Sequence, residues 1–128
     1  MLNIEAIVTA LDEEEHRAIR EGLDEESLAM FDLLIKPELS KNEREQIKRV
    51  AKDLLETLKA EKLQIENWPE KEATRSAVRV TIRDFLYNEA TGLPVSFYSD
   101  EEVETKTDLI YQHVFLQYRG YGAQGYAR

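Results

Sequence analysis

The chain has 128 residues with 26 acidic and 17 basic side chains, for a net charge of −9, and 42% of its residues are hydrophobic. That length and hydrophobic content fit one globular domain with a real core, and the absence of cysteine excludes a disulfide framework, a thiolate zinc site and a cysteine nucleophile. The acidic total excludes a uniformly basic surface, and without an apolar run of about 20 residues we expect a cytoplasmic protein that does not span a membrane.

The first third of the chain predicts three short helices. Apolar residues over 2–10 keep the three- and four-residue spacing of a helix. Asp12 is a suitable cap for a second helix, which Gly22 would end in the left-handed conformation. Asp24 would cap a third helix, which must end before Pro37 because the residue that precedes a proline disfavours the α conformation.

The fourth and clearest helix is expected to begin at Ser40. Ser40 and Glu43 have the spacing of a capping box, in which each side chain accepts a hydrogen bond from the backbone amide of the other. Glu45 and Arg49, four residues apart, are expected to pair on the exposed side. The core stripe of this helix repeats at helical spacing and consists of Ile47, Val50, Ala51, Leu54, Leu55 and Leu58.

A fifth helix is expected at the only tryptophan, Trp68. Asn67 could cap it together with Glu70, and Pro69 would stand in the first turn, where its missing N–H costs nothing. The side of this helix that lies opposite its basic residues is the predicted buried face, made of Ala73, Thr74, Ala77, Val78, Thr81 and Phe85.

The last third of the chain predicts a loop and a sixth helix. Gly92 and a nearby proline indicate a loop over 88–98, from which Val95 and Phe97 are expected to turn inward. Ser99 and Glu102 form a second capping box. The core stripe of the helix that follows is Val103, Thr107, Ile110, Val114 and Tyr118.

These elements predict an all-α fold. No strand pattern occurs, so we expect a compact bundle of about five to six helices that forms a single domain over 1–119. Residues 120–128 hold three glycines and no apolar period, and are expected to form a flexible tail.

A row of four cations is the first candidate site. Lys71, Arg75, Arg79 and Arg83 follow one another at four-residue intervals, so they form a slanted stripe along one side of the fifth helix. Residues 36–86 hold 12 basic and 10 acidic residues, so a local basic face is compatible with the acidic total. The row could bind phosphates, or it could pair with carboxylates of neighbouring helices. Three cations of the preceding helix could extend it: Lys48, Arg49 and Lys52.

Aromatic residues form the second candidate site. Trp68 could anchor a partner or plug the end of the bundle, and the sequence favours the plug. Tyr111, Phe115 and Tyr118 form an aromatic strip beside the apolar stripe of the last helix, so some of this strip could be exposed for docking.

No catalytic or metal site is predicted. The acidic clusters 12–15 and 100–102 fall in the first turns of predicted helices, where carboxylates stabilise the helix dipole. His16 and His113 lie far apart, without the spacing of a zinc motif.

Four segments carry a family pattern: EEEHRAIREGLDEESLAMFDLL, KPELSKNEREQIKRVAKDLLETLKAEKL, NWPEKEATRSAVRVTIRDFL and VFLQY. The most characteristic piece runs from the tryptophan into the basic row, and consists of Trp68, Thr74, Arg75, Ala77, Val78, Arg79 and Ile82. In this order the segments resemble the C-terminal helical domain of the R (motor) subunit of type I restriction endonucleases, over nearly the entire chain. The tail over 120–128 does not follow the family pattern.

The resemblance implies that the chain is one end of a longer subunit with a nuclease and two ATP-driven motor domains. ATP and Mg²⁺ would act in those domains, and no cofactor is expected in this one. The subunit would dock on the modification and specificity subunits and translocate and cleave double-stranded DNA. The chain itself has no GxxxxGK[ST] phosphate loop, in agreement with a module that has no chemistry of its own.

Three hypotheses follow for this domain. In the first, it joins the methyltransferase core and contacts duplex DNA through the basic row. In the second, it is a helical adaptor that does not contact DNA, because its arginines are held in salt bridges between helices. In the third, which has the least support, it is an independent hydrolase that uses the acidic clusters.

Overall fold

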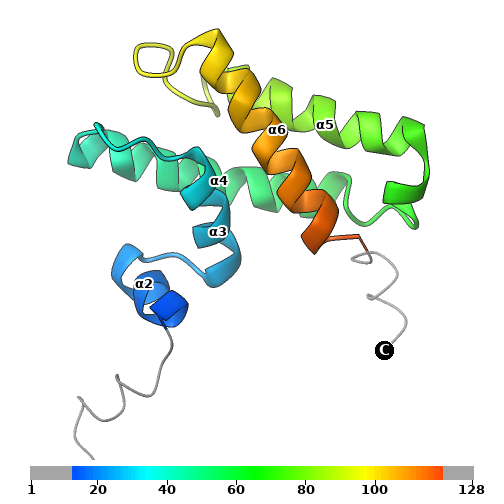
Figure 1. Cartoon of the computed structure of the whole chain (residues 1–128), viewed down its shortest axis with the longest axis horizontal. Coiled ribbons are helices and arrows are strands. Elements are labelled where there is room, and N and C mark those ends of the chain that lie inside the picture. The colour runs from blue at the N-terminus through cyan, green and yellow to red at the C-terminus, as the bar shows by residue number, and fades with distance from the viewer. Residues whose placement is uncertain (1–12, 120–128) are drawn as a thin grey trace, which may run out of the picture.

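Residues 13–119 are described by the computed structural model, and they form an all-α fold (Figure 1). Within this range there are five α-helices, one 3-10 turn and no β-strand: α2 (Glu13–Glu21), α3 (Glu25–Leu34), α4 (Lys41–Glu61), η1 (Trp68–Glu70), α5 (Glu72–Tyr87) and α6 (Asp100–Gln117). The predicted fold class is therefore confirmed. The helix expected over 2–10, the cap expected at Asp12 and the tail expected over 120–128 lie outside the described residues.

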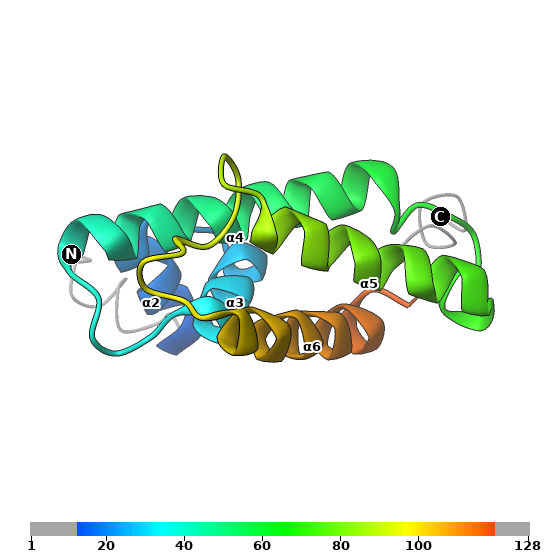
Figure 2. The same cartoon turned by 90° about the horizontal axis from the view of Figure 1, so that it is seen from above.

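The two longest helices, α4 and α6, lie on opposite sides of the bundle. Figure 2 shows α3 and α5 between them, and both inner helices contact α4 and α6. The chain runs along α4, returns along α5, and then runs as α6 from beside the end of α5 obliquely across the α4 ribbon in the view of Figure 1. Helix α2 lies at one end, where it packs against α3. Segments from the two halves of the chain thus share one core.

Most helix ends are set by the capping residues that the sequence predicted. Gly22 has a φ of 74° directly after α2, and Ser27 N donates to Asp24 Oδ1 at 2.7 Å at the start of α3. Both capping boxes form, with Ser40 N donating to Glu43 Oε1 at 2.8 Å and the equivalent bonds at the start of α6. These caps satisfy backbone amides that have no partner inside the helix.

The core is built from the predicted stripes of α4 and α6, whose apolar residues are all buried. The largest fully buried side chains are Trp68, Phe31, Leu28, Met30, Leu34, Ile47, Leu54, Leu58, Leu63, Ile82, Leu86 and Ile110. They come from α3, α4, η1, α5 and α6 and from the segment after α4, so every described helix except α2 contributes to this set.

The start of α5 differs from the prediction. Asn67 adopts the left-handed conformation with a φ of 57° and makes no capping hydrogen bond, while residues 68–70 form η1. The α-helix begins only at Glu72, after Lys71. The Thr74 hydroxyl contacts the carbonyl oxygens of Trp68 and Lys71 at 2.6 and 3.0 Å, and so ties η1 to the first turn of α5.

The buried face of α5 also differs from the prediction. The fully buried residues are Val78, Ile82 and Leu86, whereas Ala73 is exposed. This stripe lies about 60° around the helix from the basic row, rather than opposite to it. The reason is that α5 packs against both α4 and α6, so the row borders a packed seam and is only partly exposed.

In the loop between α5 and α6, the residues that are buried are not the ones predicted. Val95 is 77% exposed and Phe97 is 39% exposed, while Leu93 and Tyr98 are buried. The Tyr98 hydroxyl donates to the carbonyl oxygen of Leu34 at 2.7 Å, which fixes the loop against the end of α3. The expectation that Val95 and Phe97 turn inward is therefore wrong.

Candidate interaction surface

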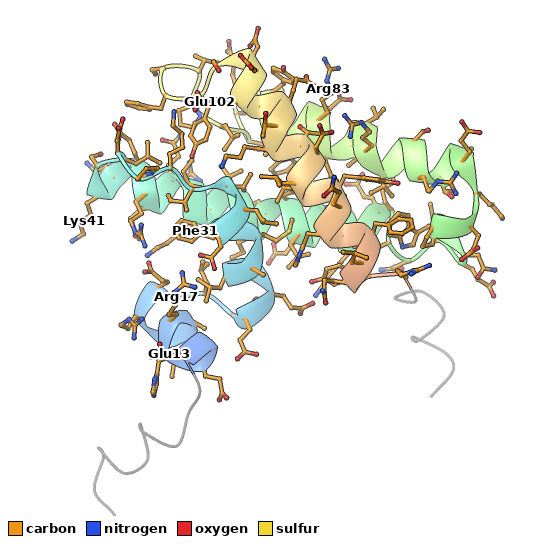
Figure 3. All side chains as sticks on the ribbon, in the orientation of Figure 1. Glu13, Arg17, Phe31, Lys41, Arg83 and Glu102 are labelled. Carbon is orange, nitrogen blue, oxygen red and sulfur yellow. The ribbon has the colours of Figure 1, made fainter. Side chains whose placement is uncertain are left out.

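Two cations of the predicted row, Arg79 and Arg83, lie at the seam between α5 and α6. Arg79 pairs with Asp108, and Arg83 Nε donates to Glu104 Oε2 at 2.7 Å. Both acids belong to α6, so each ion pair joins the two helices. We call these four residues the ion-pair edge. Figure 3 shows the Arg83 side chain at the periphery of the molecule, and the edge is open to solvent.

Glu104 accepts hydrogen bonds from two side chains at the ion-pair edge. It accepts a second hydrogen bond from the Tyr87 hydroxyl at 2.7 Å. The hydrogen bonds from Arg83 and Tyr87 lower the pKa of the Glu104 carboxyl, and the same contact raises the pKa of Arg83. The Glu104 carboxylate therefore stays ionised and occupies the Arg83 guanidinium. A phosphate could bind Arg83 only by displacing this carboxylate.

Arg75 has a different role from the other arginines of the row. Its NH1 group donates to the carbonyl oxygen of Pro69 at 2.8 Å, within η1. This bond holds the turn that carries Trp68 against the body of α5. Lys71, at the N-cap of α5, is exposed and forms no ion pair within residues 13–119.

Among the described residues, no acid pairs both with a cation of α4 and with a cation of the basic row. Lys48 lies against α2 instead, where it bridges Glu21 and Glu45 at 2.8 Å each. These hydrogen bonds, the one to Glu21 first, raise the pKa of Lys48. Glu45 therefore pairs with Lys48, and the predicted pairing with Arg49 is wrong. Arg49 is exposed on α4.

Lys52 is likewise exposed on α4. Neither it nor Arg49 has a carboxylate partner in the part of the chain that the structure describes. The role of the α4 cations in nucleic-acid binding stays a prediction.

Trp68 plugs the core and is not an exposed anchor. Its side chain is fully buried, its Nε1–H donates to the carbonyl oxygen of Tyr118 at 2.9 Å, and its ring meets the Phe115 ring edge-on at 6.1 Å. A buried indole satisfies its N–H in this way. A direct contact between Trp68 and a partner would require the bundle to open.

Tyr118 is also buried, at the end of α6. Its hydroxyl donates to Glu26 Oε1 at 2.7 Å, and Lys59 Nζ contacts the other oxygen of that carboxylate at 2.9 Å. The bond from Tyr118, followed by the bond from Lys59, lowers the pKa of Glu26. Tyr118 therefore joins α6 to α3 and is not available as a docking residue.

Tyr111 and Phe115 are the members of the aromatic strip that stay partly exposed. They line a surface groove of about 430 Å³ that we call the α6 groove, whose lining residues are Arg75, Tyr111, Gln112, Phe115 and Leu116. Leu116 is 66% exposed, and Leu109, two turns earlier on the same side of α6, is 38% exposed.

Sequence reasoning missed Leu116 and Gln112. The available signal was that α6 has apolar residues on more than the one face that the core requires.

The described residues show no metal centre. Within residues 13–119, no three side chains of the His, Asp and Glu types lie close enough to hold an ion together. His113 is half-buried beside Tyr118, and burial lowers its pKa. No described helix has both the length and the apolar character needed to cross a bilayer.

The described residues thus form an all-α domain with a surface groove beside α6. The family model for the C-terminal region of type I restriction enzyme HindI endonuclease subunit-like proteins matches residues 3–118. The chain belongs to this family of C-terminal domains of restriction endonuclease subunits. No curated protein and no solved structure matches the chain significantly.

Proposed function

We propose that this chain is a non-catalytic C-terminal module of a type I restriction endonuclease R subunit. Its task is to join that subunit to the methyltransferase core of modification and specificity subunits. The family membership supports the first statement. The α6 groove supports the second, because it is an apolar surface on an otherwise highly charged domain. ATP, Mg²⁺ and the nuclease would act in other domains of the full-length subunit.

The arginines of the ion-pair edge are already paired with carboxylates, which favours a role in binding protein partners over a role in binding DNA. Affinity for duplex DNA comes largely from cations that neutralise phosphates. Arg79 and Arg83 are already neutralised by α6 carboxylates, and Arg75 is bound to Pro69. The ion pairs of Arg79 and Arg83 agree with the adaptor hypothesis, whereas Arg75 forms a hydrogen bond to a backbone carbonyl instead of a salt bridge.

Contact with double-stranded DNA is the second candidate function. Lys71 is exposed one turn before Arg75, and Arg79 and Arg83 continue the same line along α5. Exposed ion pairs contribute little to stability, so phosphates could replace Asp108 and Glu104 during translocation. DNA would then compete with the carboxylates for the same guanidinium groups.

One experiment tests the assembly role. Binding of the purified 128-residue chain to the preassembled methyltransferase core is measured by calorimetry, and an R subunit that lacks this domain is tested for assembly in parallel. We expect the chain to bind the core and the truncated subunit to lose affinity. If the chain does not bind and the truncated subunit assembles normally, the assembly role is refuted.

A second experiment tests DNA contact. The double variant Arg79→Ala and Arg83→Ala is compared with the control Arg20→Ala and Lys41→Ala, which removes two exposed cations outside the row. DNA contact predicts that only the first pair lowers affinity for unrelated duplexes. It also predicts a salt dependence weaker by about 0.9 log units per decade of salt for each phosphate that the variant no longer neutralises. Equal affinities for both pairs would exclude phosphate binding by the row. Arg75 is left unchanged because its removal would disturb η1.

A further inference from the structure

The α6 groove combines an apolar lining with a cationic rim. Tyr111, Phe115 and Leu116 supply most of its lining, and Gln112 is its uncharged polar member. The groove volume of about 430 Å³ lies within the range of small binding pockets and can accept one or two large apolar side chains. Leu109 extends the apolar surface along α6.

Among the residues that line the groove, the one charged side chain is a cation. Arg75 lines it directly, and only its NH1 group is engaged with Pro69. The Arg119 guanidinium lies over the Phe115 ring, 5.1 Å from the ring centre. None of the residues that line the groove is acidic, and Asp108, one turn away along α6, is neutralised by Arg79. A cationic rim is therefore found on a domain with nine excess negative charges.

We infer that the α6 groove binds an amphipathic helix of the methyltransferase core, one whose apolar side chains are flanked by aspartate or glutamate. This inference rests on the proposed function and gives the partner a chemistry. A helix that inserts apolar residues at three- and four-residue spacing suits an apolar groove beside α6 whose apolar surface continues along that helix to Leu109. Carboxylates at its flanks would pair with the free N–H groups of Arg75 and with Arg119.

Charge complementarity argues against three other occupants. The chain's own residues 120–128 contain no aspartate or glutamate, so they lack the groups that the rim would select. A second copy of the chain carries the same net charge of −9, which opposes self-association. Duplex DNA would bring phosphates to the rim, but it has nothing to fill an apolar groove.

The sign of the charge at one position tests the inference. Leu116→Glu and Leu116→Lys both remove the exposed leucine from the groove, but they add opposite charges at the rim. Val95→Glu and Val95→Lys make the same changes at another exposed apolar residue, on the loop before α6. Affinity of each 128-residue variant for the methyltransferase core is measured by calorimetry, with circular dichroism to verify that the helix content is unchanged.

We expect Leu116→Glu to weaken binding by about 30-fold, because it removes an apolar contact and repels the acidic flanks. Leu116→Lys should weaken binding by only about fivefold, because the new cation recovers part of the affinity. Both Val95 variants should bind like the unmodified chain.

Each other outcome has a definite meaning. If the two Leu116 variants are weakened equally, the partner has no acidic flank and the inference is wrong. If the unmodified chain binds the core but neither Leu116 variant is weakened, the groove is not the interface, although the proposed function survives. If sedimentation shows that the chain self-associates through Leu116, a second copy is the occupant instead. If the unmodified chain does not bind the core at all, the proposed function itself fails.

Discussion

Replacing Trp68 by phenylalanine tests whether the end of the bundle is held by the indole hydrogen bond as well as by packing. Trp68 is fully buried, and its N–H is the donor to the Tyr118 carbonyl oxygen across 50 residues of chain. Phenylalanine keeps an aromatic ring against Phe115 but cannot donate this bond. The substitution therefore separates the polar contribution from most of the packing contribution.

The expected decrease in stability has two parts. Phenylalanine is smaller than tryptophan by roughly 40 Å³, and a cavity of that size costs about 1 kcal/mol at about 24 cal/mol per Å³. Leaving the Tyr118 carbonyl oxygen without its donor costs about 1–3 kcal/mol, because the bond is buried. We therefore expect the free energy of unfolding to fall by about 2–4 kcal/mol. A domain with ordinary stability of about 5–15 kcal/mol would remain folded.

Urea unfolding followed by far-ultraviolet circular dichroism measures this decrease, since the substitution removes the only tryptophan fluorophore. The matched control is Val95→Ala, at a 77% exposed loop position, which should change the free energy of unfolding by less than about 0.5 kcal/mol. A decrease of about 1 kcal/mol or less for Trp68→Phe would show that only the cavity matters. The account of the indole as a hydrogen-bonded plug would then be refuted.

Three further substitutions test other parts of the fold. Gly92→Ala should lower the free energy of unfolding by about 1–3 kcal/mol in a thermal melt, because a Cβ at this position would overlap the carbonyl oxygen of Leu86; an unchanged melt would contradict this packing. The Tyr118 hydroxyl, followed by Lys59, lowers the pKa of Glu26, so the stability from this carboxylate is present above its ordinary pKa of 4.5 and is lost as the pH falls through the lowered value. Glu26→Gln should therefore destabilise the domain in urea at pH 7 but have little effect at about pH 3, and equal effects at both pH values would disprove the linkage. Burial lowers the pKa of His113, so the unfolded chain binds the proton more readily and stability should decline as the pH falls below 6.5; urea unfolding of His113→Leu at about pH 7 and pH 5 should show a smaller decline than the unmodified chain does.

Local signals in the sequence were sufficient for most helix ends. Ser40 with Glu43 and Ser99 with Glu102 cap their helices through bonds that span only three residues. Such contacts do not depend on the rest of the fold, so the sequence pattern determines them. The stripes of α4 and α6 were predicted for a similar reason, because each helix buries one main face.

The start of α5 was predicted incorrectly because a distant contact decides it. Asn67, Trp68 and Pro69 have the composition of a helix start, and the local rules place the cap at Asn67. The indole, however, must reach the Tyr118 carbonyl oxygen at the far end of the chain. The left-handed conformation of Asn67 and the η1 turn accompany this placement and delay the α-helix until Glu72.

The basic row shows where sequence reasoning could not decide the candidate site. Its spacing predicted that the cations share one side of α5, but the chain offers 26 possible carboxylate partners. The partners that the fold selects are Asp108, 29 residues after Arg79, and Glu104, 21 residues after Arg83. Only the antiparallel register of α5 against α6 brings these pairs together, and no local rule gives that register.

The same register explains why the α6 groove is apolar. The acids at 104 and 108 of α6 are used by the arginines of α5, so charge along this edge is neutralised within the domain. One turn beyond Asp108 the ion pairs end. Arg75 donates a hydrogen bond to the Pro69 carbonyl oxygen, and the nearby residues of α6 are Tyr111, Gln112 and Phe115. The α5–α6 seam therefore runs from paired charges into an apolar groove bordered by cations. A partner that covered only the paired part would gain little, because it would have to break ion pairs to bind. A partner that fills the groove removes exposed apolar surface such as Leu116 from water, which is the larger source of binding free energy.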